Sequence, residues 1–141
     1  MSRVRRILAP MTGLTPYLSF DGTARDALEF YRGVFGGELV VSTFGEFGRD
    51  DGPADRIAHG MLQGAVELFA SDAGSGEPTL ALRGILFSLL GTAEPATLEE
   101  WFAALAVGGE VLDPLALRPW GDHDGQVRDR FGVTWLIGYQ G

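Results

Sequence analysis

The side chains able to do acid–base or metal chemistry are few in this chain. It contains two histidines, His59 and His123, and no cysteine. A thiol nucleophile and every cysteine-ligated zinc or iron–sulfur site are therefore excluded. Every basic residue is an arginine, so Schiff-base chemistry on a lysine is excluded as well. The sequence also lacks a serine-nucleophile elbow, a dinucleotide-binding glycine motif and a zinc-protease helix motif.

Glu67 is a candidate general base. A buried position beside Phe69 would give its carboxylate that role, whereas an ion pair with an arginine such as Arg83 would make it structural. Its relation to His59 depends on the turn at Gly64-Ala65. A two-residue hairpin loop puts the two side chains on opposite faces of the sheet, and a three-residue loop would put them on the same face.

Two roles are open for each histidine. His59 either anchors the sheet through a hydrogen bond to its ring or lies in a ligand pocket. His123 is either solvated or functional. The segment 121–125 that contains it, Gly-Asp-His-Asp-Gly, is typical of a turn and favours the solvated role. Three acidic residues that end strands or open turns are expected to fix loops by accepting backbone N–H hydrogen bonds: Asp72, Asp122 and Asp129.

Three aromatic side chains with a polar group could line a slot for a flat or cationic ligand. These are Tyr17, Trp120 and Trp135. Packing in the hydrophobic core is the alternative for each of them.

The elements that must position these side chains form a repeat. Residues 35–40 (Phe-Gly-Gly-Glu-Leu-Val) match residues 107–112 (Val-Gly-Gly-Glu-Val-Leu) at an offset of about half the chain, which is typical of a duplication. A helical pattern precedes each Gly-Gly pair, which is expected to end the helix. Asp21 or Thr23 is the expected N-cap of the first helix, and Thr97 with Glu100 is the expected capping box of the second.

Period-two patterns around the helices predict strands. The predicted ranges are 15–20, 39–47, 57–63 and 66–71 in the first half, and 84–90, 111–117, 125–130 and 133–139 in the second. The expected fold class is α+β, with two tandem βαβββ modules whose curved mixed sheets form a cup. The predicted organisation is a flexible leader (1–13), a first module (14–73), a linker (74–82) and a second module (83–141), together one compact domain.

Composition narrows the possible partners and the location. The 141 residues, 45% of them hydrophobic, suffice to bury a core, and the net charge of -8 disfavours nucleic acid. No apolar run approaches the roughly 20 residues that span a bilayer, so no membrane partner is expected. The absence of cysteine favours the reducing cytoplasm.

Several motifs in a fixed order carry a family resemblance. They are residues 16–22 (PYLSFDG), 27–31 (ALEFY), 35–38 (FGGE), His59, the strand end 68–72, 120–122 (WGD) and 126–135 (QVRDRFGVTW). In these residues the chain resembles the PhnB-like branch of the glyoxalase/bleomycin-resistance/extradiol dioxygenase superfamily, also called vicinal oxygen chelate proteins. The resemblance implies the duplicated βαβββ fold and a homodimer. Some relatives carry the name of a demethylubiquinone methyltransferase, but no methyl-donor site at the end of a parallel strand is recognisable here.

The resemblance also implies where a metal would be bound. Metal enzymes of this superfamily take His or Glu ligands from the first and last strands of both modules. The matching positions are Thr15, Glu67, Gly84 and about Leu136, of which Glu67 alone could bind a cation. No metal and no other cofactor is therefore expected, and a non-standard metal site that uses Glu67 or His59 is the alternative.

Three functions stay open at this point. The first is a metal-free small-molecule binding protein that holds its ligand in the cup between the modules, against Tyr17, His59, Glu67, Phe69, Trp120 and Trp135. The second is a metal-dependent or Glu67-dependent lyase or dioxygenase of the same superfamily. The third is a regulatory or structural dimer whose cup is filled by its own side chains. The missing metal ligands favour the first.

Overall fold

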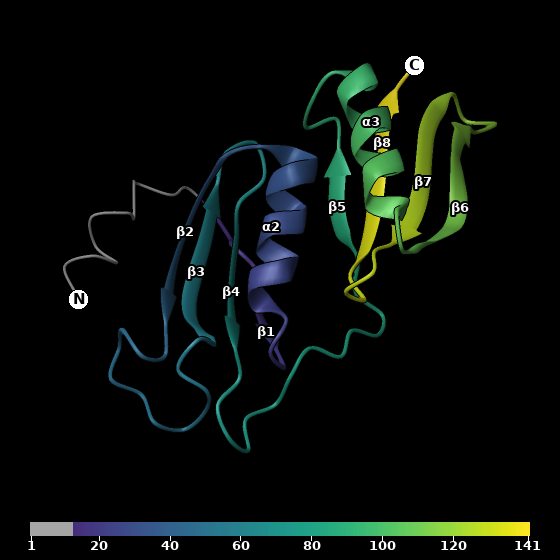
Figure 1. Ribbon diagram of the computed structural model, residues 1–141. Coiled ribbons are helices and arrows are strands. Elements are labelled where there is room, and N and C mark those ends of the chain that lie inside the picture. The colour runs from purple at the N-terminus through teal and green to yellow at the C-terminus, as the bar shows by residue number, and fades with distance from the viewer. Residues whose placement is uncertain (1–12) are drawn as a thin grey trace. The chain divides into compact units, whose positions relative to one another are not determined.

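The chain divides into two compact units, with the boundary between Leu80 and Ala81. A computed structural model describes residues 13–141 (Figure 1). The predicted leader, 1–13, lies outside the described residues except for Gly13. The boundary between the units falls within the predicted linker 74–82.

The first unit is a four-stranded mixed sheet with one helix. Its elements are β1 (Tyr17–Phe20), α2 (Ala24–Phe35), β2 (Glu38–Thr43), β3 (Ile57–Gln63) and β4 (Leu68–Asp72). The strand order is β1-β4-β3-β2, with β1 parallel to β4 and the other pairs antiparallel. The helix packs against β2, β3 and β4 (Figure 1). Its apolar face buries Leu28, Tyr31 and Phe35.

The second unit repeats this plan. Its elements are β5 (Phe87–Leu90), α3 (Pro95–Ala106), β6 (Glu110–Leu117), β7 (Asp122–Arg128) and β8 (Thr134–Gln140). The strand order is β5-β8-β7-β6, again with one parallel pair, β5 with β8. The helix packs on β6, β7 and β8 through Leu98, Trp101 and Leu105. The predicted α+β class with two βαβββ modules is confirmed.

The Gly-Gly pairs follow the helix and allow a close backbone approach in both units. Gly36 ends α2 with a φ of 74°, and its N–H donates to the Arg32 carbonyl oxygen over 2.7 Å. A Cβ on Gly37 would overlap the Gln63 carbonyl oxygen, and a Cβ on Gly109 would overlap the Arg128 carbonyl oxygen. The strand after the helix therefore approaches its neighbour too closely for any side chain, at equivalent places in both units.

The two helices begin differently from one another. Thr23 is the N-cap of α2, as predicted, but its side chain makes no capping hydrogen bond. The N-cap of α3 is Glu94, and Pro95 occupies the first turn. The predicted capping box of Thr97 and Glu100 is wrong, because proline with its fixed φ starts the helix before Thr97.

Two buried aspartates join segments within their units, as predicted. The Asp72 carboxylate accepts hydrogen bonds from the N–H of Ala24 (3.0 Å), at the start of α2, and from the N–H of Ile57 (2.9 Å), at the start of β3. It therefore supplies the cap that Thr23 does not.

Asp129 is buried in the loop between β7 and β8. One of its oxygens accepts from the N–H groups of Phe131 (2.8 Å) and Val133 (3.1 Å), and the other accepts from the Trp135 indole N–H (2.9 Å). Among the described residues, the side chain of Asp122 makes no comparable bond. Neither described helix is long and apolar enough to cross a membrane.

Candidate functional site

The best candidate site lies on the face of the first sheet that is turned away from α2. A Cβ on Gly60 would meet the Leu28 side chain of α2, so Gly60 faces the helix. Because side chains alternate along a strand, His59 points to the other face. Tyr17 of β1 and Phe69 of β4 are partners in the parallel register and point to the same side as His59. We call this group of three side chains the His59 surface.

The three rings of the His59 surface are in mutual contact. The centroid of the His59 ring lies 5.6 Å from that of Tyr17 and 5.6 Å from that of Phe69, and Tyr17 meets Phe69 edge-on at 5.9 Å. The Tyr17 hydroxyl is hydrogen-bonded to His59 Nδ1 at 2.9 Å. Tyr17 is 49% exposed, so this aromatic group reaches the surface of its unit.

His59 keeps one hydrogen-bonding atom without a partner. Its Nε2 is buried and has no hydrogen bond within the described part of the chain. Leaving such an atom unpaired costs about 1–3 kcal/mol, whichever nitrogen carries the proton. Burial lowers the pKa of His59 below its ordinary value of 6.5, so the ring is neutral at pH 7. A neutral ring can donate or accept one further hydrogen bond at Nε2.

Ser42 is a neighbour of His59 that the sequence analysis did not find. It lies directly opposite His59 in the β2–β3 register and is 3% exposed. Alternation along β2 could have placed it on this face, but only the register identifies its cross-strand partner.

Glu67 lies on the same face as His59 but not beside it. Leu62 pairs with Leu68 and Gly60 with Ala70, so residues 64–66 form a three-residue loop. The assumption of a two-residue loop, with the two side chains on opposite faces, is wrong. Gln63 then falls opposite Glu67. Because Gln63 is four residues along β3 from His59, Glu67 is displaced from His59 by roughly 13 Å along the strand direction. Within its own unit, Glu67 has no ion pair or side-chain hydrogen bond among the described residues.

The remaining predicted aromatic residues do not join this group. Trp120 is 68% exposed in the turn between β6 and β7. Trp135 is 1% exposed, packs edge-on against Phe87 at 5.4 Å, and donates to Asp129. Its position is therefore the core packing that the sequence left as the alternative.

His123 also differs from expectation. The solvated turn predicted for it is wrong, because residues Asp122–Arg128 form β7 and pair with β8. Its ring stacks on Tyr139 with centroids 4.7 Å apart and planes 16° from parallel. Like His59, it has a buried nitrogen, Nδ1, without a hydrogen-bond partner in residues 13–141.

The residues at the superfamily's metal positions do not fit a metal. In the first unit these positions hold Thr15 and Glu67, and in the second they hold Gly84 and Leu136. One carboxylate cannot supply the three or more protein ligands of such a site. In the described residues, no three His, Asp or Glu side chains lie together as a metal-binding group.

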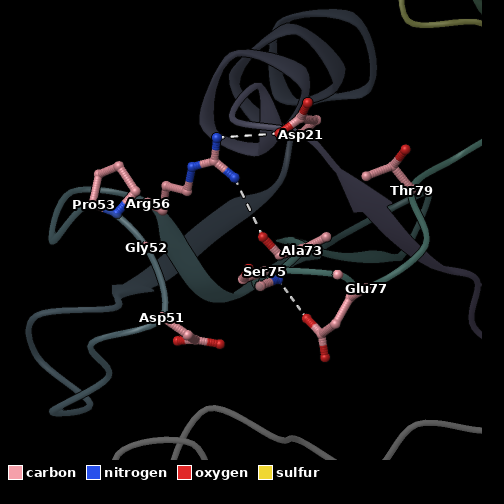
Figure 2. Close-up of a pocket in the computed structure, with 11 residues that line it drawn as sticks. Asp21, Asp51, Gly52, Pro53, Arg56, Ala73, Ser75, Glu77 and Thr79 are labelled. Carbon is pink, nitrogen blue, oxygen red and sulfur yellow. Dashed lines mark hydrogen bonds and ion pairs between the residues drawn. The ribbon is translucent and has the colours of Figure 1, made fainter.

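A polar hollow of about 490 Å³ at one end of the first sheet is held together by its own charges. Figure 2 shows Arg56 between Asp21 and Ala73. Arg56 donates to the Asp21 carboxylate over 3.1 Å and to the Ala73 carbonyl oxygen over 3.3 Å, and the Gly74 N–H donates to Glu77. Asp51, which also lines the hollow, is paired with Arg49 at 2.6 Å. Because these groups satisfy one another, they tie the strand ends together, and they contrast with the unpartnered nitrogen of His59.

Comparisons with known proteins agree with this architecture. The family model described as Glyoxalase/Bleomycin resistance protein/Dioxygenase superfamily matches residues 13–137. The chain is 30% identical over 139 residues to the protein YjdN of Escherichia coli K12. This alignment covers 88% of this chain and 92% of YjdN.

Solved structures give the same result. The crystal structure of PA1353 from Pseudomonas aeruginosa superimposes with a TM-score of 0.75 at 34% identity, covering 92% of this chain and 98% of PA1353. The PhnB protein of Bacillus cereus, whose name includes a 3-demethylubiquinone-9 3-methyltransferase, also gives 0.75, at 23% identity, over 91% of this chain and 99% of its own. The chain therefore belongs to the glyoxalase/bleomycin resistance/dioxygenase superfamily.

Proposed function

We propose that the protein is a metal-free small-molecule binding protein that takes a flat ligand on the His59 surface. The observation that carries this proposal is the buried, unpartnered Nε2 of His59 within three contacting rings. A ligand with a planar ring and one hydrogen-bonding group would stack on Tyr17 and Phe69 and pair with Nε2. Part of its binding free energy would come from removing the cost of the unpaired nitrogen.

The enzymatic alternative receives less support from the site. Glu67 lies too far from His59 to act with it as an acid–base pair, since such groups work within hydrogen-bonding reach. The methyltransferase in the name of the Bacillus cereus relative is not part of this proposal. Each sheet here has a single parallel strand pair, whereas a methyl-donor site of the doubly wound type needs a parallel sheet with a glycine-rich turn.

Ligand screening with two matched histidine variants tests the proposal. Planar heteroaromatic compounds would be screened by thermal shift, and binders followed by NMR at the His59 ring nitrogens. The expected result is a ligand that raises the melting temperature of the wild type and of His123→Phe, but not of His59→Phe. A ligand that binds His59→Phe as tightly as the wild type contradicts the site.

Metal analysis of untagged protein purified without chelator tests the metal-free part. The expected result is less than stoichiometric zinc, nickel, iron or manganese, and no change of melting temperature when each ion is added. A stoichiometric ion, or a shift that rises with ion concentration, would overturn it in favour of a site at Glu67 or His59.

We also propose a homodimer. The second sheet ends in β6, an edge strand on which Val111 and Leu117 are 44% and 62% exposed. Edge strands with exposed apolar side chains are common sites of self-association. Light scattering on the eluted protein is expected to give twice the mass of 15.1 kDa. A monomeric mass across the accessible concentration range would contradict this assembly.

A further inference from the structure

The second unit contains a hollow of about 640 Å³ on the face of its sheet that is turned away from α3. Gln126 and Arg128 of β7 point to this face, and Thr134 of β8 is the register partner of Arg128. Val127, which lies between Gln126 and Arg128, is fully buried on the opposite face, the one that packs on the helix. Arg83 lines the same hollow from the segment that precedes β5, so we call it the Arg83 pocket.

The Arg83 pocket is positive in an acidic protein. The chain has 19 acidic residues and 11 arginines, yet no Asp or Glu lines this hollow. Within residues 13–141, Arg83 has no ion pair and no side-chain hydrogen bond. Arg128 approaches only Glu110, at 3.8 Å, and both side chains are at least half exposed, so this pair is weak. The polar hollow of Figure 2 is the opposite case, because its arginine is already bound to Asp21.

The rest of the lining is apolar and exposed. Ile85 and Leu86 are 49% and 41% exposed in the segment that also carries Arg83. Exposed apolar side chains lie next to Arg83, which has no partner within residues 13–141, and Arg128, which has only the weak pair with Glu110. Together they provide the two parts of a site for an amphipathic anion. The volume is within the range of pockets that bind small organic molecules.

We propose that the Arg83 pocket binds a small organic anion, with a carboxylate or phosphonate held by Arg83 and Arg128 and an apolar group against Ile85 and Leu86. The Gln126 amide and the Thr134 hydroxyl orient the head group. This inference rests on the proposed function only in taking the protein to be a small-molecule binder. It concerns a different unit from the His59 surface, so the two can fail separately.

Calorimetry with probes that share one tail tests the charge preference. The probes are 4-phenylbutyrate, 4-phenylbutylphosphonate, 4-phenylbutylamine and 4-phenylbutanol. The two anions are expected to bind about tenfold or more tightly than the amine and the alcohol, because charge-assisted hydrogen bonds to arginine are available only to them. The ratio of the two anion affinities identifies the preferred head group. Equal affinity for all four probes, or tighter binding of the amine, would overturn the proposal.

Arginine variants test the location. Arg83→Gln and Arg128→Gln are each expected to weaken anion binding about tenfold, whereas Arg25→Gln, an exposed arginine of α2, leaves it unchanged. Because Arg83 is exposed, its substitution is not expected to unfold the protein. Unchanged affinity in both pocket variants would overturn the proposal.

NMR mapping separates this inference from the proposed function. Anion-dependent amide shifts are expected at residues 82–86, 126, 128 and 134. Shifts confined to Tyr17, His59 and Phe69 would overturn the Arg83 pocket while supporting the His59 surface. Anion binding at the Arg83 pocket without any planar ligand for the His59 surface would support this inference alone.

Discussion

The two units share a backbone plan but are anchored by aspartates at different places. In the first unit, Asp72 joins the end of β4 to the starts of α2 and β3. In the second, Asp129 closes the β7–β8 loop and fixes the Trp135 indole. The common plan therefore depends on backbone requirements such as the close approaches at Gly37 and Gly109, whereas the side chains that stabilise it have diverged.

The sheet faces turned away from the helices have diverged further. The first carries aromatic rings around a neutral histidine, and the second carries arginines beside apolar side chains. Neither face has to match the other for the fold to form, so chemistry specific to this protein is best sought on them.

Removal of the aspartate anchors should have the largest effect. Asp129→Ala leaves three donors unpaired and is expected to lower the free energy of unfolding by about 4 kcal/mol, and Asp72→Ala, with two, by about 3 kcal/mol. Urea unfolding followed by circular dichroism and tryptophan fluorescence measures both. The control is Asp122→Ala, which should change stability by no more than about 0.5 kcal/mol. An equal loss in all three variants would show that the hydrogen bonds are not the cause.

Alanine at the shared glycines should have the next largest effect, and an equal one in the two units. Gly37→Ala and Gly109→Ala each place a Cβ against a carbonyl oxygen and should cost about 2–3 kcal/mol. Gly33→Ala, inside α2 with open space around it, should instead stabilise by about 0.5–1 kcal/mol. Calorimetric melting measures all three. A neutral Gly109→Ala would show that the second unit has lost the constraint that the first retains.

The protonation of His59 should have the smallest effect on stability. Its pKa is lowered in the folded state, so the unfolded chain takes up the proton first as the pH falls below 6.5. The contribution of the neutral ring is therefore complete above pH 6.5 and is lost as the pH falls towards the lower pKa of the folded state. NMR titration should give a midpoint below 6.5 for His59.

Tyr17→Phe is the matched variant for this titration. It removes a hydrogen bond to the neutral ring and should move the His59 midpoint upward. An unchanged His59 midpoint would show that burial alone, and not Tyr17, keeps the ring neutral.

Sequence patterns predicted the elements better than their contacts. The predicted range of β3, 57–63, agrees residue for residue with the structure. The β3–β4 loop could not be settled in this way, since loops of two and three residues both fit Gly64 and Ala65. The difference of one residue in the length of this loop decides whether Glu67 shares a face with His59.

The candidate site was only partly predictable. Tyr17, His59 and Phe69 were named from their residue types, and the register explains why they meet. Trp135 could not be assigned from its type, because an indole suits a core and a pocket equally and its bond to Asp129 depends on the fold. The two pocket arginines, Arg83 and Arg128, lie 45 positions apart in the sequence, so only the folded sheet shows that they face one hollow.

The parallel pairing of the first and last strand in each unit has a consequence for synthesis on the ribosome. Tyr17 pairs opposite Phe69, and Phe87 opposite Trp135, so each sheet is completed only by its final strand. The first unit cannot close before residue 72 has left the exit tunnel, and until then β1 lacks β4, its one strand partner among residues 13–141. The second unit likewise closes only after β8 has emerged. A chain interrupted before residue 134 would consist of a complete first unit joined to a second unit in which β5 lacks its β8 partner.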